Sequence, residues 1–159
     1  MAVDGIADRR SVVDGQWHHV AAVFAEGVRE RTVTFLVDGE ASATMPLPSP
    51  LPSSPRNARL VMGARDADDV DALGAQGAEL SEVRLWQRAL TAEQLGEHLH
   101  RPVHHGSRDL AAYWRLGAVF DGDPPQVVDA TIGRNDGDVI GPAWPTPVAI
   151  PRIMADGVT

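Results

Sequence analysis

Short runs of alternating side chains dominate this chain and predict β-strands. In WHHVAAVF, residues 17–24, successive side chains point to opposite faces, and both faces are largely apolar. RTVTFLV, residues 31–37, alternates in the same way. Alternation over this length is typical of strands, so we expect a strand over each range.

A tight turn joins the second run to the next one. Asp38-Gly39 follows RTVTFLV at once and precedes EASATM, residues 40–45. Asp-Gly between strand-like runs is typical of a two-residue hairpin turn, which needs positive φ at both central positions. We therefore expect Arg31–Val37 and Glu40–Met45 to pair antiparallel.

Further strand-like runs follow a proline-rich connector at residues 46–55, which cannot be a central strand because proline lacks the ladder N–H. An acidic, glycine-bearing loop lies between the first two of them. In chain order, the expected strands lie within Ala58–Ala64, Glu79–Trp86, and residues 110–116, 126–130 and 136–144.

One helix interrupts the strands. Thr91 is a favourable N-cap, and Gln94 three residues later completes a capping-box pattern. Leu95 and Leu99 share one face, and Pro102 ends the helix, so we expect it over Thr91–His100. Many short strands with one short helix indicate an all-β fold, a jelly-roll-like sandwich of two antiparallel sheets.

Size and composition narrow the function. The 159 residues are the size of one domain, and we expect a single domain over residues 1–159. A net charge of −8 argues against a nucleic-acid partner, and no apolar run is long enough for membrane insertion. The chain has no cysteine, which excludes disulfides, thiol catalysis and cysteine-bound zinc.

Four motifs occur in a recognisable order: DGQWHHVAAVF, VTFLVDGE, LVMGAR and GAELSEVRLWQRALTAEQL. Together they resemble the concanavalin A-like lectin/glucanase superfamily, and in particular the laminin G-like jelly-roll domains of bacterial secreted proteins. The resemblance is best over residues 14–100. It implies a recognition module of a larger extracellular or cell-surface protein, with a glycan or an extracellular protein as partner.

The tail, residues 109–145, resembles a segment that closes a unit of this family or opens the following one. The strands expected before residue 14 are reduced to a short stretch. We therefore expect a fragment of a larger protein or a unit truncated at its N-terminus by a misplaced start codon, with a unit completed by its C-terminal strands as the alternative. Missing strands would leave unpaired edges that favour self-association.

The histidines invite a catalytic or metal-binding interpretation. His18 and His19 are neighbours in a predicted strand, so they face opposite sides and cannot grip one ligand together. A second cluster comprises His98, His100, His104 and His105, without the spacing of helical zinc ligands. We expect structural or surface roles, with metal binding as the open alternative.

Glycoside hydrolysis requires two carboxylates flanking one bond. The nearest candidates, Glu79 and Glu82, are three apart and point to opposite faces of a strand. We therefore expect no enzyme, although a glycoside hydrolase remains an alternative.

Calcium is the expected cofactor, in a structural role. The segment DATIGRNDGD carries Asp129, Asn135, Asp136 and Asp138 around two glycines, and hard oxygen ligands on a tight loop suit Ca²⁺. Related jelly rolls often bind calcium at such loops. The alternative is a turn stabilised by its own Asn, Asp and Gly residues.

Aromatic side chains can stack on sugar rings. We expect Trp17 and Trp86 to lie in the core, and Trp144, flanked by two prolines, to be the exposed ligand-binding aromatic. The sequence thus predicts a non-catalytic carbohydrate-binding or adhesive module, with a protein-interaction or spacer module as the alternative.

Overall fold

The computed structural model divides the chain into two compact, interleaved units. Unit 1 comprises residues 1–53 and 88–101, and unit 2 comprises residues 54–87 and 102–159. The structure describes residues 2–3, 6–7, 12, 14–28, 30–47, 60–62, 79–99, 101–116 and 125–139, of which 2–3 and 6–7 as backbone alone.

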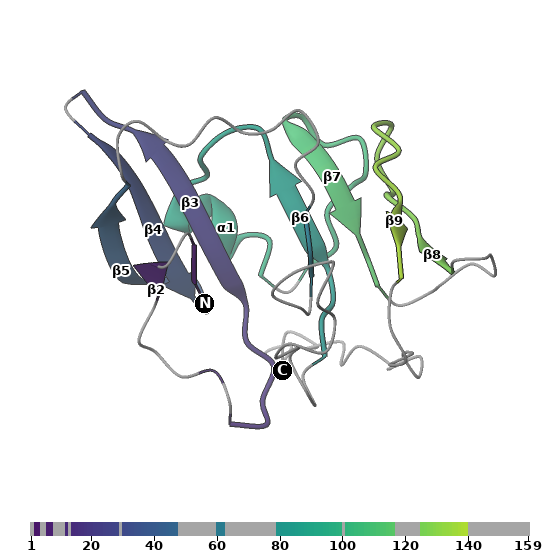
Figure 1. Cartoon of the computed structure of the whole chain (residues 1–159), viewed down its shortest axis with the longest axis horizontal. Coiled ribbons are helices and arrows are strands. Elements are labelled where there is room, and N and C mark those ends of the chain that lie inside the picture. The colour runs from purple at the N-terminus through teal and green to yellow at the C-terminus, as the bar shows by residue number, and fades with distance from the viewer. Residues whose placement is uncertain are drawn as a thin grey trace, which may run out of the picture. The chain divides into compact units, whose positions relative to one another are not determined.

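Unit 1 is built on a three-stranded antiparallel sheet. Its strands are β3 (Val20–Glu26), β4 (Arg31–Val37) and β5 (Glu40–Pro46), with β4 in the middle (Figure 1). The two-residue strands β1 (Ala2–Val3) and β2 (Ile6–Ala7) form a separate antiparallel pair.

The predicted hairpin between β4 and β5 is confirmed. Asp38 and Gly39 have φ values of 53° and 83°, as the Asp-Gly turn requires. The register pairs Val37 with Glu40, and a bulge follows between Phe35 and Leu36. Glycine is needed for a second reason, because a Cβ at position 39 would lie 3.2 Å from Cδ1 of Leu99.

The core of unit 1 lies on one face of β4. Val33, Phe35 and Leu47 are buried together, and Ala22 of β3 packs against them. Burying a side chain such as Phe35 stabilises the fold by about 1.5–3 kcal/mol. The edge strand β3 is less well covered by other side chains, since its Phe24 remains 52% exposed.

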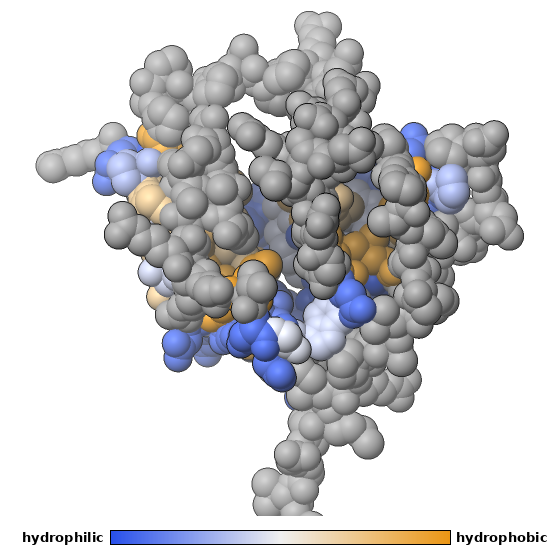
Figure 2. Space-filling view, turned by 60° about the horizontal axis from the view of Figure 1, so that its bottom comes forward, coloured by the Kyte–Doolittle hydropathy of each residue, from blue (hydrophilic) through white to orange (hydrophobic). Residues whose placement is uncertain are grey.

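The first strand-like run departs from its prediction. β3 begins at Val20 rather than at Trp17, because the backbone N–H of His19 is capped by the Asp38 side chain instead of entering a ladder. Although both faces of this run are largely apolar in sequence, no residue of β3 is fully buried. Figure 2 shows hydrophobic residues reaching the surface beside hydrophilic ones.

The single helix of the described chain, α1, spans Ala92–Gly96. Thr91 caps it as predicted: its hydroxyl accepts from the N–H of Gln94, and the Gln94 side chain accepts from the N–H of Thr91. The helix is shorter than expected because the chain continues as a turn, in which the N–H of Leu99 donates to the carbonyl three residues earlier.

Unit 2 contains two antiparallel strand pairs. β6 (Val83–Trp86) pairs with β7 (Leu110–Trp114), and β8 (Gln126–Val127) pairs with β9 (Gly137–Asp138). β6 is shorter than the predicted strand because Glu82 has a φ of 56°, which ends extended backbone.

The expectation of an all-β fold is confirmed: every described strand pair is antiparallel, and helix is almost absent. The described strands form four small sheets rather than two. Of the predicted strand Ala58–Ala64, residues 60–62 are described and are not in a strand. Among the described residues no helix is long and apolar enough to cross a membrane.

Candidate functional site

The loop that follows β8 in unit 2 is organised around one buried carboxylate, Asp129, which is 1% exposed. Its Oδ1 accepts hydrogen bonds from the backbone N–H groups of Tyr113 and Thr131, both at 2.9 Å. Its Oδ2 accepts from the Thr131 hydroxyl at 2.9 Å, and from the backbone and side-chain N–H groups of Asn135 at 3.0 and 2.9 Å. We call this arrangement the Asp129 hub.

These donors keep Asp129 ionised. Burial alone would raise the pKa of the carboxyl, but the N–H groups of Thr131, Tyr113 and Asn135 outweigh it and lower the pKa of Asp129 to about 2. A buried charge is tolerated where hydrogen bonds satisfy it. The hub therefore fastens the loop to β7, where Asp129 also forms an antiparallel bridge with Trp114.

The loop backbone is held by close contacts as well. A Cβ on Gly133 would lie 2.7 Å from Nδ2 of Asn135 and 3.2 Å from the carbonyl oxygen of Ala111, so a larger residue would push the Asn135 amide away from Asp129. Nε1 of the buried Trp114 donates to the carbonyl oxygen of Asn135 at 2.8 Å. Residues 129–135 thus form a pre-shaped loop.

Asp129, Asn135 and Asp136, three of the predicted calcium ligands, lie in or beside this loop, and Asp138 follows in β9, but several of their oxygens are already engaged by donors of the chain. Calcium needs about six to eight oxygen ligands that face it. Both oxygens of Asp129 face N–H and O–H donors, Asp136 accepts from the N–H of Asp129, and Asp138 accepts from the Gln126 side chain. Calcium binding stays a prediction, and the geometry favours the self-stabilised turn.

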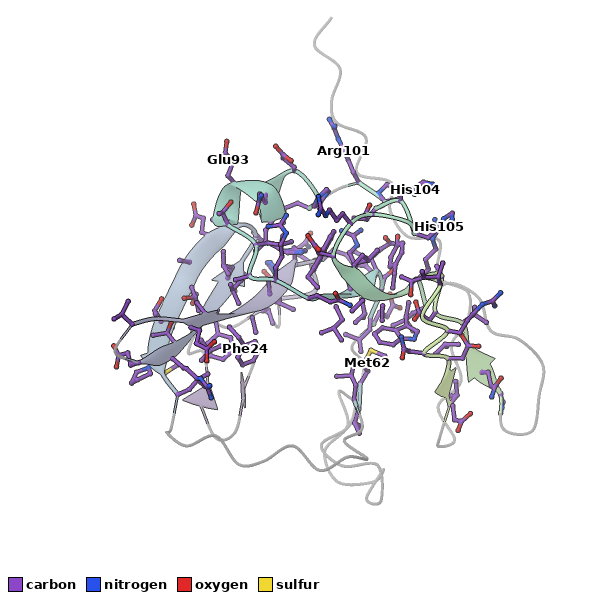
Figure 3. All side chains as sticks on the ribbon, turned by 90° about the horizontal axis from the view of Figure 1, so that it is seen from above. Phe24, Met62, Glu93, Arg101, His104 and His105 are labelled. Carbon is purple, nitrogen blue, oxygen red and sulfur yellow. The ribbon has the colours of Figure 1, made fainter. Side chains whose placement is uncertain are left out.

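A shallow hollow of about 340 Å³ lies beside the hub. It is lined by Val128–Ile132, Arg134 and His105. Ile132 is 95% exposed, and Arg134, with a φ of 50°, is also exposed. The ring of His105 stacks on that of His104 with 4.3 Å between centroids, and Figure 3 shows the two side by side.

The side chains that line this hollow differ in whether they form hydrogen bonds within the chain. The Thr131 hydroxyl is used within the loop, because it donates to Asp129 and accepts from the N–H of Gly133. Arg134, in contrast, makes no hydrogen bond or ion pair with the described part of the chain. The loop therefore presents a free guanidinium on a fixed backbone.

The other histidines do not assemble a metal site. His98 lies in the turn after α1 in unit 1, His104 and His105 lie in unit 2, and His100 falls outside the described residues. Within the described ranges no group of three or more His, Cys, Asp or Glu side chains is placed to hold a metal ion.

Glu82 belongs to a hydrogen-bonded network of unit 2. Its Oε2 accepts from the hydroxyl of the fully buried Tyr113 and, at 2.8 Å, from Nη2 of Arg84. Burial and the bond to Glu82 raise the pKa of Tyr113, so the phenol stays a neutral donor. The guanidinium of Arg84 lies 5.3 Å from the centroid of the Tyr113 ring. Glu79 is exposed, and nothing described joins it to Glu82 as a pair.

In unit 1, His18 bridges two carboxylates. Its Nδ1 lies 2.8 Å from Oδ2 of Asp38, and its Nε2 lies 3.0 Å from Oδ1 of Asp14. Hydrogen bonds to two carboxylate acceptors favour an N–H on each ring nitrogen, which is the imidazolium form. The bonds to Asp38 and Asp14 raise the pKa of His18. We call these three residues the His18 clamp, and its role is to tie residues 14–19 to the hairpin turn.

The tryptophans differ from their predictions. Trp17 lies before β3 and is 40% exposed, so its assignment to the core is wrong. Trp86 is half-buried in β6, whereas Trp114 is buried. Trp144, the predicted ligand-binding aromatic, lies outside the described residues.

Sequence reasoning missed Arg134 and His105 as parts of one hollow. They are 29 positions apart, and no periodic pattern connects them. The signal that was available is the motif around Asp129, because a tight Asn/Asp/Gly turn leaves the side chains between its anchors free to face outwards.

The comparisons with known proteins identify the family. A family model of the laminin G type, described as the concanavalin A-like lectin/glucanases superfamily, matches residues 2–96, which is more than half of the chain. The Asp129 loop lies beyond the matched range. No curated protein and no solved structure matches the chain. On the strength of the family match and its antiparallel all-β fold, the chain belongs to the concanavalin A-like lectin/glucanase superfamily.

Proposed function

We propose that this protein is a non-catalytic recognition module that binds carbohydrate at the hollow beside the Asp129 hub. Members of a lectin-like family are suited to binding glycans or proteins. The observation that carries the proposal is the contrast within one loop: its backbone is fixed by Asp129, while Ile132 and Arg134 extend from it unengaged. A pre-shaped site loses less conformational entropy when a ligand binds.

The hollow suits a sugar in size and polarity. Its volume of about 340 Å³ is at the small end of ligand sites, where one or two rings fit. Ile132 offers an apolar contact for the C–H face of a ring, and His105 offers a ring face and an N–H donor.

The absence of catalysis is part of the proposal. Glu82, the best-placed carboxylate of the predicted pair, already accepts from Tyr113 and Arg84, so it is held as a structural acceptor. Family membership also supports an extracellular or cell-surface location for the parent protein. Release of reducing sugar from a glycan, lost in Glu82→Gln, would contradict the non-catalytic assignment.

Calcium is not required by this proposal. The donors of Thr131, Tyr113 and Asn135 already give the loop its shape. We expect glycan binding to be unchanged by a chelator, and a chelator-sensitive interaction would restore calcium as the organiser of the loop.

A second candidate, protein–protein interaction, is favoured by the exposed apolar side chains of unit 1. Val20 and Phe24 of β3 are 44% and 52% exposed, and Val28 beyond the strand is fully exposed. Apolar groups clustered on one strand are typical of surfaces that bind other proteins.

A glycan array tests the proposal, using the full chain with calcium and again with chelator. We expect saturable binding to a defined glycan class, weakened in Ile132→Ala and unchanged in Leu85→Ala, an exposed apolar control on β6 that does not line the hollow. If a chain that melts cooperatively binds no glycan on the array, carbohydrate binding is overturned and the protein-interaction function is favoured.

A further inference from the structure

The lining of the hollow is chemically biased once its internal hydrogen bonds are counted. Of its four polar side chains, Asp129 and Thr131 are committed to the loop itself. Asp129 is 1% exposed, so its oxygens are not available to a ligand. The groups left to face a ligand are the Arg134 guanidinium and the His105 ring.

The two remaining groups differ in what they offer. Arg134 offers a planar fork of N–H groups, which matches the two oxygens of a carboxylate or a sulfate. His105 offers a ring N–H and, when neutral, an acceptor nitrogen, and its one described contact is the stack on His104. Arg134 is a donor in every protonation state, so it pairs best with an anionic acceptor, which a neutral sugar lacks.

The net charge of the chain bears on this preference for an anionic ligand. The chain carries a net charge of −8, so anions are repelled from most of its surface. A free arginine in a hollow of such a protein offers an anionic group a charge pairing that most of its surface does not. The fixed backbone around Arg134, held through Asn135 by Asp129, limits the entropy lost on pairing.

We propose that the hollow binds an acidic sugar, with Arg134 paired to its carboxylate or sulfate, His105 donating from the rim and Ile132 against the ring. This proposal rests on the proposed function, because it assigns a ligand class to the same site. The carboxylate and the sulfate share the chemistry that Arg134 recognises, so the test has to separate them.

The experiment is a titration of the isotope-labelled full chain, followed by backbone amide chemical shifts. The three probes are D-glucose, D-glucuronate and D-glucose 6-sulfate. They share one pyranose ring and differ only in the group at C6. We expect the amides of residues 130–136 to shift with one or both acidic sugars and not with glucose. Which acidic sugar binds more tightly identifies the carboxylate or the sulfate as the source.

Matched arginine variants assign the effect to the hollow. Arg134→Gln should weaken acidic-sugar binding by about tenfold or more, the effect of one charge-assisted contact. Arg108→Gln makes the same charge change at an exposed arginine of unit 2 that does not line the hollow, and should leave binding within about twofold. A retained spectrum shows that each variant is folded.

The other outcomes separate the two proposals. If glucose shifts the same amides as strongly as the acidic sugars do, the acidic ligand class is wrong and the recognition site stands. If Arg134→Gln and Arg108→Gln weaken binding equally, general charge attraction explains the result and the Arg134 pairing is wrong. If no sugar moves these amides, the carbohydrate function of this hollow is overturned as well.

Discussion

Two clusters built on carboxylates hold chain segments in place in this protein. One cluster is buried and the other is exposed to solvent. The Asp129 hub of unit 2 is buried and gathers five donors on one side chain. The His18 clamp of unit 1 spans two carboxylates whose side chains are more than half exposed. The buried cluster is therefore costly to break, while the exposed one is weakened by solvent screening and responds to pH.

The largest effect is expected for Asp129→Asn. The new amide keeps the size but replaces one acceptor with a donor that faces other donors, so we expect a loss of about 3 kcal/mol in the free energy of unfolding. Denaturant unfolding of the full chain measures it. The control, Asp138→Asn, removes an exposed carboxylate of β9, the strand that follows the loop, and should change stability by about 0.5 kcal/mol or less. Equal losses in the two variants would contradict a hub centred on Asp129.

Thr131→Val tests the buried cluster further, because it removes one hydrogen-bond donor to Asp129. The buried hydroxyl is lost, and the N–H of Gly133 loses its acceptor, so we expect a loss of about 1–2 kcal/mol. Thr131→Ser keeps the hydroxyl and should recover most of the loss, measured by the same unfolding curve. If Thr131→Val is as stable as the parent chain, the hydroxyl of Thr131 does not hold the hub.

Asp38→Asn tests the exposed cluster. Asparagine tolerates the positive φ of this turn position, so the variant isolates the loss of the charge pair with His18. We expect a drop in Tm smaller than that of either hub variant, and a difference from the parent chain that shrinks as salt is added. A drop as large as that of Asp129→Asn would show that exposure does not set the cost.

The smallest effect is expected from pH. The pKa of His18 is raised in the fold, so its stabilising contribution is complete below 6.5 and is lost as the pH rises through the raised value. The pKa values of Asp14 and Asp38 are lowered, so their contributions are present above 3.8 and are lost as the pH falls. The clamp is thus strongest between these two values.

The hub behaves differently over the same range. The lowered pKa of Asp129 makes its contribution present above 3.8 and lost only as the pH falls towards about 2. Raising the pH from about 6 to about 9 should therefore lower the Tm of the parent chain slightly, and this slope should vanish in His18→Gln. A slope that persists in the variant would assign the effect to another group.

The two clusters also differ in how far the sequence predicts them. Asp38-Gly39 has a local signature, so the turn and the pairing of β4 with β5 could be predicted from neighbouring residues. The partners of His18 could not, because Asp14 and Asp38 lie four and twenty positions away and the strand pattern indicated that residues 17–19 were extended ladder.

For the Asp129 loop, the sequence located the site but not its chemistry. A run of Asp, Asn, Thr and Gly is shared by calcium loops and by turns that bond to themselves. What separates them is the N–H of Tyr113, 16 positions earlier, which reaches Asp129 only when β7 lies alongside the loop. Short-range patterns carry no information on that contact.

The contact between Gly39 and Leu99 has a consequence for the order in which the chain can fold. Leu99 belongs to the second segment of unit 1, residues 88–101, and residues 54–87 of unit 2 are synthesised before it. The hairpin that carries Gly39 therefore leaves the ribosome long before the side chain that packs on it. Unit 1 can therefore close only after part of unit 2 has emerged, and closure over such a sequence separation is expected to be slower than formation of the hairpin itself.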